Sequence, residues 1–343
     1  MIDNWKLAVG ASAAVASGVL AGALIASSLS DRKSKVSPIK KWVCVGRVSK
    51  LILYPVKSCQ GIHVDEATAT MIGLNARDNL RDRVFMVVNE KYVFQTQRTI
   101  PKMALIETNV NGNQLILSAP NMDEISVDIP SNSKATTKSC RIFDDFVAET
   151  LDCGDDVGKW LDDFLGKTGL RVVYHSLEKT QRPMTPLQKK FPTFVPSDKP
   201  AFHDQTSYML MSERSIDELN TKLETTQVSH KNFRPSILIK DALEPYAEDF
   251  WSYLKIGEAG PIFKAAKPCT RCKLTTVNPA TGEFIPSGEP LSKLTTITKS
   301  RTMGDAKVDA LVKNQAIIGL QLGLFEGEGR PLKVGDPVYA AVL

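Results

Sequence analysis

Two cysteines separated by two residues are the strongest candidates for chemistry in this sequence. They lie in the run Lys267-Pro268-Cys269-Thr270-Arg271-Cys272-Lys273. Pro268 biases the residue before it toward extended geometry, and the β-prone residues 273–277 predict a strand that begins beside Cys272. A guanidinium next to a thiol favours the thiolate, which is a ligand for soft metals. The run therefore predicts a rigidly held thiolate.

Three other roles are open to such a pair. A structural zinc site needs two more ligands, and the sequence has no second C-x-x-C and no H-x₃₋₅-H pattern. A thioredoxin-like pair opens a helix, whereas this pair precedes a predicted strand. The third role is that of two small buried hydrophobic residues. Taken alone, the pair leaves this third role as open as a functional one.

Cations recur beside predicted strand ends. Four loops carry a residue type that binds oxyanions: Lys57-Ser58, Arg81 with Arg83, Arg234, and Arg271. Arginine next to proline or asparagine at a strand end is consistent with a clamp for a phosphate or a polyanionic cofactor. Each residue alone is better explained as a solvated surface charge. Their joint occurrence with the cysteine loop favours an anion-binding site.

Short strands must position these loops. The sequence predicts strands at 43–54, 115–117, 125–129 and 237–239, and a hairpin at 83–94. An amphipathic helix is predicted at 155–165, and Ser212 is expected to cap a second helix with Ile216, Leu219 and Leu223 on its buried face. The pattern predicts a β-rich α+β fold with barrel-like domains rather than a doubly wound sheet. The absence of G-x-G-x-x-G and Walker sequences argues against a bound nucleotide.

Composition narrows the class of protein. The chain has 343 residues, of which 43% are hydrophobic and 24% charged, as in ordinary globular proteins. Its net charge of +5, without a dense basic run interleaved with aromatic residues, argues against nucleic-acid binding. Six cysteines in a chain of this length do not form a disulfide scaffold and fit a reducing compartment.

The N-terminus predicts a membrane anchor. Residues 7–29 carry no charge, and a basic stretch that ends at Lys41 follows them. A membrane-spanning helix needs about 20 apolar residues, and the basic flank keeps the following domain on the cytosolic side. A cleaved signal peptide is the alternative. The run resembles the signal anchors of mitochondrial outer-membrane proteins, and we expect an uncleaved anchor and basic linker at residues 1–41.

Four motifs together resemble the MOSC family of molybdenum-cofactor proteins. They are Leu53-Tyr54-Pro55-Val56-Lys57-Ser58-Cys59, Asn79-Leu80-Arg81-Asp82-Arg83, Asn232-Phe233-Arg234-Pro235 and Cys269-Thr270-Arg271-Cys272. The resemblance covers roughly residues 46–343. It implies a β-barrel-like MOSC N-terminal domain at 42–168, packed on a MOSC β-barrel domain at 169–343. Molybdopterin would bind in the cleft between them.

The resemblance also implies roles for single residues. Cys272 would be the protein thiolate on molybdenum, and Asp204 would lie near the metal and relay protons. The pterin and its phosphate would be held by Lys57, Ser58, Arg83 and Arg234. The remaining residues of the cofactor site would be Thr206, Asn232, Ser236, Thr270 and Arg271. The chain departs from the family pattern in two places: Asp-Thr-Ser reads Asp204-Gln205-Thr206, and no tyrosine lies between Gln315 and Phe325.

The implied activity is the reduction of N-hydroxylated compounds such as amidoximes, N-hydroxyguanidines and hydroxylamines. Electrons would come from NADH through cytochrome b5 reductase and cytochrome b5. With the anchor, this predicts a protein of the mitochondrial outer membrane whose C-terminal domains face the cytosol. Two alternatives remain: a molybdenum-cofactor sulfurase-like domain, and a membrane-anchored cofactor-binding or carrier protein without turnover.

Overall fold

The computed structural model describes residues 41–77, 80–130, 137–143, 145–175, 183–198 and 202–342, with the backbone alone at 145–149 and 342. Residues 43–341 form one compact unit, and residues 1–42 with 342–343 belong to another. All but the last residue of the predicted anchor at 1–41 lie outside the described residues. None of the described helices is long and apolar enough to cross a bilayer.

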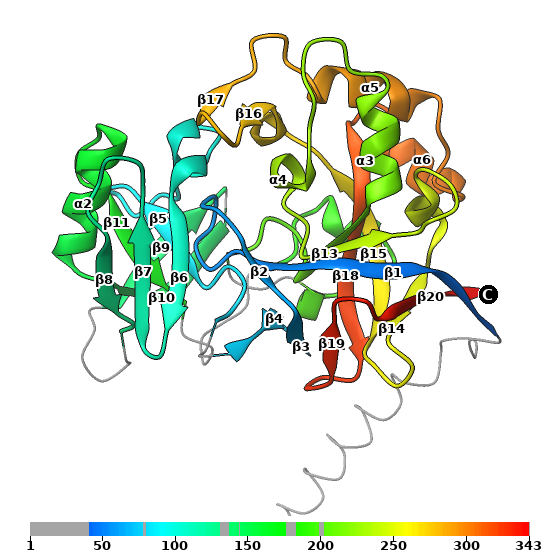
Figure 1. Cartoon of the computed structure of the whole chain (residues 1–343), viewed down its shortest axis with the longest axis horizontal. Coiled ribbons are helices and arrows are strands. Elements are labelled where there is room, and N and C mark those ends of the chain that lie inside the picture. The colour runs from blue at the N-terminus through cyan, green and yellow to red at the C-terminus, as the bar shows by residue number, and fades with distance from the viewer. Residues whose placement is uncertain are drawn as a thin grey trace, which may run out of the picture. The chain divides into compact units, whose positions relative to one another are not determined.

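The largest sheet contains strands from both ends of the chain and closes on itself. Its order is β13-β12-β18-β15-β14-β20-β1-β2, and β13 also pairs with β1 (Figure 1). Closure of a sheet leaves its strands few unpaired edges. The strands are β1 (Lys41–Leu53), β2 (Ile62–Val64), β12 (Tyr208–Ser212), β13 (Ile237–Lys240), β14 (Tyr253–Ile256), β15 (Ile262–Thr270), β18 (Ile317–Glu326) and β20 (Pro337–Val342).

Smaller sheets surround this one. One has the order β5-β11-β10-β9, a second β6-β7-β8, a third β19-β3-β4 and a fourth β16-β17. Their bounds are β3 (Glu66–Thr70), β4 (Gly73–Asn75), β5 (Phe85–Val88), β6 (Glu107–Asn111), β7 (Gln114–Ser118), β8 (Ile125–Asp128), β9 (Thr137–Ile142), β10 (Asp145–Asp152), β11 (Arg171–Tyr174), β16 (Val277–Asn278), β17 (Glu283–Phe284) and β19 (Pro331–Lys333).

The predicted helices are confirmed. Helix α2 (Asp155–Leu165) has the predicted bounds and buries Trp160 and Leu161 among others. Ser212 caps α3 (Glu213–Asn220) by accepting a hydrogen bond from the Arg214 amide, and Ile216 and Leu219 are buried as expected. Leu223, also expected on the buried face, lies beyond the end of α3 and is only partly buried. The other α-helices are α4 (His230–Phe233), α5 (Leu291–Lys299) and α6 (Ala306–Val312). Short 3₁₀ helices lie at η3 (Pro101–Leu105), η4 (Gln188–Lys190), η5 (Pro196–Asp198), η6 (Ala247–Phe250) and η7 (Lys273–Thr276).

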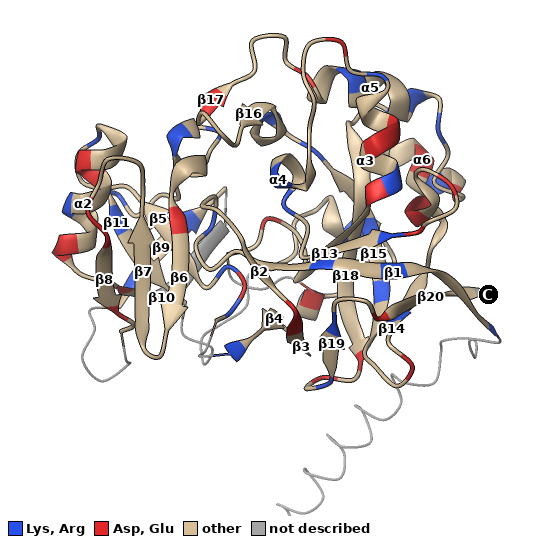
Figure 2. Cartoon of the chain, viewed as in Figure 1, with Lys and Arg blue, Asp and Glu red and all other residues tan. Residues whose placement is uncertain are grey.

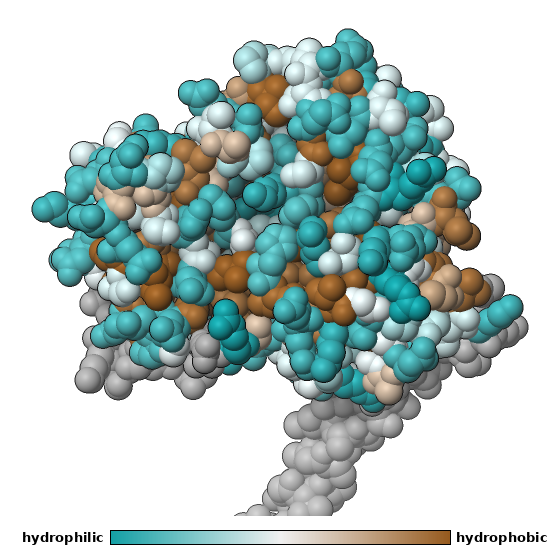
Figure 3. All heavy atoms as spheres, in the orientation of Figure 1, coloured by the Kyte–Doolittle hydropathy of each residue, from teal (hydrophilic) through white to brown (hydrophobic). Residues whose placement is uncertain are grey.

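One apolar core joins the two halves of the described chain. It includes Leu161 and Val172 together with Leu210 and Leu320. The outside is polar over most of the face in Figure 3, with apolar side chains gathered in a strip near β1 and β2. Lysines and arginines are interspersed with acidic residues around the elements in Figure 2, rather than collected in one basic stripe.

One local prediction is wrong and another is confirmed in part. Residues 273–277 do not form a strand, because η7 occupies Lys273–Thr276 and only Val277–Asn278 pair in β16. The Thr275 hydroxyl donates to the Cys272 carbonyl at 2.9 Å, and the Thr276 hydroxyl donates to the Lys273 carbonyl at 2.8 Å. These local side-chain hydrogen bonds stabilise a tight turn against the β-propensity of the threonines. The predicted hairpin at 83–94 is confirmed around its turn, where Val88 and Phe94 form an antiparallel bridge and the Gln95 amide donates to the Val87 carbonyl at 2.8 Å. The ladder partner of β5 is nevertheless β11.

The sheet order adds a fact about domain organisation. Strand β1 pairs with β13, which lies far along the chain, in the register Arg47 with Lys240 and Leu51 with Ile237. The closed sheet is therefore completed by the first described strand. The boundaries 1–41, 42–168 and 169–343 stay a prediction, and the pairing shows that residues on both sides of 168 share one sheet.

Gly319 of β18 provides a test of how this sheet positions the site. Its φ of +83° is unfavourable for other residues, and an added Cβ would lie 2.6 Å from Met211 Cγ and 3.2 Å from Arg271 Nη2. We expect Gly319→Ala to lower the free energy of unfolding by about 2–5 kcal/mol, from backbone strain and overpacking together. Gly329 has almost the same φ, +82°, but open space around it. Chemical denaturation of Gly329→Ala therefore measures the strain alone, and equal losses in the two variants would contradict the overpacking.

Candidate functional site

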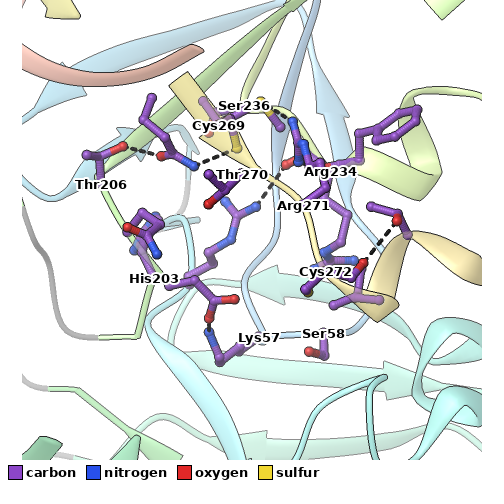
Figure 4. Close-up of a pocket in the computed structure, with 18 of the residues that line it drawn as sticks. Lys57, Ser58, His203, Thr206, Arg234, Ser236, Cys269, Thr270, Arg271 and Cys272 are labelled. Carbon is purple, nitrogen blue, oxygen red and sulfur yellow. Dashed lines mark hydrogen bonds and ion pairs between the residues drawn. The ribbon is translucent and has the colours of Figure 1, made fainter. Parts of the chain in front are cut away.

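A cavity of about 340 Å³ opens among the loops that were predicted to bind an anion. In Figure 4, Lys57 and Ser58 lie on one side of it and Ser236, Cys269 and Thr270 on the other. Every residue predicted to bind the cofactor lines this cavity: Lys57, Ser58, Arg83, Asp204, Thr206, Asn232, Arg234, Ser236, Thr270, Arg271 and Cys272. The fold therefore brings together side chains that were singled out from separate parts of the sequence.

The carboxylate of Asp204 lies between two cations. Lys57, in the loop after β1, forms an ion pair with one carboxylate oxygen and also donates to the Phe202 carbonyl at 2.8 Å. Nη1 of Arg98 lies 3.4 Å from the other carboxylate oxygen. The Asp204 side chain is 37% exposed, so it remains reachable from the cavity. Two charge-assisted contacts thus fix its orientation.

A second network is centred on buried Asp82. Its carboxylate accepts from the Tyr54 amide at 2.9 Å and lies 2.5 Å from Arg83 Nη1 and 3.3 Å from His203 Nε2. Burial alone raises the pKa of Asp82, but Arg83, His203 and the Tyr54 amide outweigh it and the pKa is lowered. Burial lowers the pKa of His203 to about 4, although Asp82 opposes the shift. At neutral pH the pair is therefore a carboxylate beside a neutral imidazole.

Arg234 carries a donor that none of the described residues uses. Its guanidinium lies 4.2 Å from the centre of the Tyr54 ring, and its Nη1 donates to the Cys59 carbonyl at 2.5 Å. Among the described residues nothing accepts a hydrogen bond from its Nη2, which is buried. Burial lowers the pKa of Arg234 to about 10, so the side chain is still a cation at neutral pH. A buried, charged, unpaired donor is costly unless an anion completes it.

Three of the predicted phosphate-binding residues have left-handed backbone conformations. The φ angles are +69° at Ser58, +53° at Arg83 and +60° at Arg234, which is the residue that ends α4. Only a few per cent of non-glycine residues adopt such angles. Each costs about 1–2 kcal/mol, and strain of this kind is concentrated at ligand sites. Their occurrence at three loops of one cavity supports a functional origin.

Two other predicted site residues make mainly structural contacts. The Arg271 guanidinium donates to the Ile318 carbonyl at 2.9 and 2.6 Å and to the Phe233 carbonyl at 3.0 Å. The Asn232 amide donates to the Val277 carbonyl at 3.2 Å and accepts from the Ser229 amide at 3.1 Å. Both side chains line the cavity, and their hydrogen bonds join the segments that form its walls.

The two cysteines have different surroundings. Cys269 lies within β15, is 3% exposed and accepts a hydrogen bond from Gln321 Nε2 at 2.8 Å, in a chain that continues to Thr206 (Figure 4). Cys272 caps η7, and its partly exposed sulfur lies 3.6 Å from Arg98 Nη1. The expectation that Cys272 begins a strand is wrong. Its sequence neighbour Arg271 is engaged elsewhere, and the cation beside its sulfur is Arg98.

Comparison with known proteins supports the resemblance of the four motifs. Residues 45–168 match the MOSC N-terminal beta barrel domain, and residues 197–339 match the MOSC domain. Over 295 residues the chain is 37% identical to mitochondrial amidoxime-reducing component 1 of Homo sapiens, covering 86% of this chain and 83% of that protein. The chain belongs to the MOSC family.

Further members of the family have similar coverage. Mitochondrial amidoxime reducing component 2 of Homo sapiens is 36% identical over 298 residues, which is 87% of this chain and 84% of that protein. Component 1 of Danio rerio is 35% identical over 302 residues, covering 88% and 86%. The MOSC matches confirm the β-rich α+β fold with an N-terminal MOSC β-barrel domain followed by a MOSC domain.

The MOSC cavity contains residues that were missed in the sequence. Arg98, His203 and Gln321 line it beside the predicted residues. Arg98 follows a strand-like run and precedes a proline by three residues, so the criterion that selected the other arginine loops could have included it. His203 and Gln321 carry no comparable sequence signal, because each acquires its partners only from distant segments.

The buried His203 predicts a pH dependence of stability. Its pKa in the folded protein is below the value of about 6.5 expected when unfolded. The unfolded chain therefore binds the extra proton first, and stability is lost as the pH falls from about 6.5 toward 4. We expect His203→Gln to reduce this acid-induced loss by roughly 1–3 kcal/mol. Urea denaturation of both proteins at pH 7 and pH 4.5 measures the loss of unfolding free energy. An equal loss in the two proteins would contradict a role of His203 in the acid sensitivity.

Proposed function

We propose that this MOSC protein is a molybdenum-cofactor-dependent reductase of N-hydroxylated compounds. The observation that carries the proposal is the Cys272 thiol in the wall of a cavity with a large excess of positive charge. The lining contains one carboxylate, that of Asp204, and five cationic side chains, those of Lys57, Arg83, Arg98, Arg234 and Arg271. A soft ligand beside donors for an anion is the combination that a metal carried by a phosphorylated cofactor requires.

The residues present fit such a group. Cys272 would supply the thiolate to the metal, and the free Nη2 of Arg234 is suited to the phosphate. Lys57, Ser58 and Arg83 would contribute the remaining contacts from the opposite wall. Asn232, Ser236, Thr270, Arg271 and Thr206 would shape the walls. When bound, the cofactor supplies the two-electron redox chemistry that no side chain of this site provides.

The overall reaction defines what the side chains must do. Reduction of an N–OH group to N–H takes two electrons and two protons and releases water. Asp204 is the carboxylate that both lines the cavity and is fixed by Lys57 and Arg98. We infer that it passes protons to the departing oxygen, since a carboxylate reachable from the cavity can exchange protons with water. Cys269, buried against Gln321, would support the wall without touching the reacting atoms.

The electron donors and the location are part of the same proposal. The relatives are named as mitochondrial proteins that reduce amidoximes. For this chain we infer electron delivery from NADH through cytochrome b5 reductase and cytochrome b5. We also infer an outer-membrane location with the C-terminal domains toward the cytosol. The substrate class is amidoximes, N-hydroxyguanidines and hydroxylamines.

The two cysteines provide the central test. We expect the wild-type chain to hold molybdenum and pterin and to reduce benzamidoxime with the reconstituted electron chain. Cys272→Ser should lower turnover by at least roughly 100-fold, because the metal loses its protein ligand. Cys269→Ser should retain activity within about tenfold, since a serine oxygen can still accept the hydrogen bond from Gln321. Molybdenum, pterin and turnover are measured for all three proteins.

Each result has a defined meaning. Full turnover of Cys272→Ser would refute the thiolate assignment, and equal loss in both variants would indicate a site built on two cysteines. A wild-type chain that holds the cofactor but shows no turnover would support a carrier rather than an enzyme.

The anchor has a separate test. The uncharged run at 7–29 is expected to bind the chain to the membrane, so a chain lacking residues 1–41 should move to the soluble fraction. Sedimentation of cell extracts with carbonate washing compares it with the full chain. A truncated protein that still sediments with membranes would show that another part of the chain binds them.

A further inference from the structure

Arg98 lies beside the sulfur of Cys272, the residue that we propose as the metal ligand, and the four family motifs do not include it. Its Nη1 lies 3.6 Å from Cys272 Sγ and 3.4 Å from Asp204 Oδ2. Its Nη2 is buried and has no hydrogen-bond partner in the described part of the chain. One guanidinium therefore contacts the sulfur and the carboxylate, and the Arg98 side chain, which is 20% exposed, lines the cavity.

Two aromatic rings hold this guanidinium in place. Its central carbon lies 4.9 Å from the centre of the Phe143 ring and 5.6 Å from that of Phe94, and the two rings are 4.9 Å apart. Phe143 is 42% exposed and lines the cavity, so it also forms part of the entrance. Stacking on aromatic faces fixes a planar guanidinium without consuming its N–H donors. The two rings thus orient the Arg98 guanidinium without accepting hydrogen bonds from it.

The neighbouring residue ties the Arg98 loop to the opposite wall. Gln97 is buried, and its Nε2 donates to the Ser58 carbonyl at 2.7 Å. The pair Gln97-Arg98 therefore joins the Ser58 loop to the Cys272 loop across the cavity. A position fixed from two sides suits a group that must meet a reacting atom within a narrow tolerance.

We propose that Arg98 binds the substrate, through its guanidinium, at an oxygen that carries negative charge beside the Cys272 sulfur. This rests on the proposed function for its chemistry, because cleavage of the N–O bond leaves the departing oxygen with negative charge until a proton reaches it. A fixed N–H donor aimed at developing charge stabilises it. The substrates favoured by this arrangement are N-hydroxylated compounds whose N–O oxygen is ionised or polarised, over compounds with a cationic group at that position.

A test that does not need the cofactor isolates Arg98. The full chain, produced without cofactor, is alkylated at fixed pH with anionic iodoacetate and with neutral iodoacetamide. Mass spectrometry of the Cys272 peptide gives the two rates. Their ratio cancels the fraction of thiolate and reports the attraction of an anion to the sulfur's surroundings. We expect Arg98→Met to lower the iodoacetate/iodoacetamide ratio by roughly three- to tenfold and Arg98→Lys to lower it less.

Arg171→Met is the matched control, since Arg171 is also paired with an aspartate but does not line the cavity. It should leave the ratio at the wild-type value. An unchanged ratio in Arg98→Met would overturn the proposal. A fall of the same size in Arg171→Met would show that the change in net charge, not the position of Arg98, is responsible, and would overturn it equally.

The loaded enzyme separates this proposal from the proposed function. Arg98→Met should keep molybdenum and pterin within about twofold of wild type while kcat/KM for benzamidoxime falls at least roughly tenfold. Loss of the cofactor in proportion to the loss of activity would assign Arg98 to cofactor binding instead. A wild-type chain without molybdenum or turnover would refute the proposed function, whereas the alkylation ratio would still decide whether Arg98 binds anions.

Discussion

The concentration of positive charge around one cavity is the constraint on which the rest of this structure depends. Removing a guanidinium from water is costly unless hydrogen bonds and opposite charge replace the solvent. Asp82 and Asp204 supply the carboxylates, the Tyr54 ring lies against Arg83 and Arg234, and backbone carbonyls accept from the other donors. The compensation is incomplete within the described residues, because Nη2 of Arg98 and of Arg234 stay unpaired. Unpaired buried donors of this kind are expected where a ligand completes them.

The backbone is strained at the same places. Ser58, Arg83 and Arg234 each have positive φ, so the loops that carry them turn sharply into the cavity. Because Gly319 has no side chain, β18 can lie close to the Arg271 guanidinium. The Ile318 carbonyl then accepts two hydrogen bonds from that guanidinium. Each strained backbone conformation costs about 1–3 kcal/mol of folding free energy. The fold tolerates this because the closed sheet and the continuous core hold the ends of these loops in place. The strained loops thus lower the stability of the fold while they fix the positions of the site residues.

Residues from both MOSC-matched regions build the cavity. Lys57, Arg83 and Arg98 come from the region 45–168, while Arg234 and Cys272 come from 197–339. The first strand, β1, is itself paired in the closed sheet with β13. Each region thus contributes cations to the cavity, and neither region forms the lining by itself. A chain cut between the two regions would lose the cavity rather than retain half of it.

The sequence by itself determined the local elements and most of the site membership. Helix α2 and the cap of α3 follow from apolar spacing and from Ser212, and both are set by contacts within a few residues. The residues that the family resemblance assigned to the cofactor all line one cavity, and most of them belong to the four short motifs. Only the tertiary structure decided which atoms meet. Arg98 rather than Arg271 lies beside the Cys272 sulfur, and η7 replaces a predicted strand. The partner of a side chain is set by contacts between segments far apart in the sequence, and the spacing of residues along the chain cannot predict these contacts.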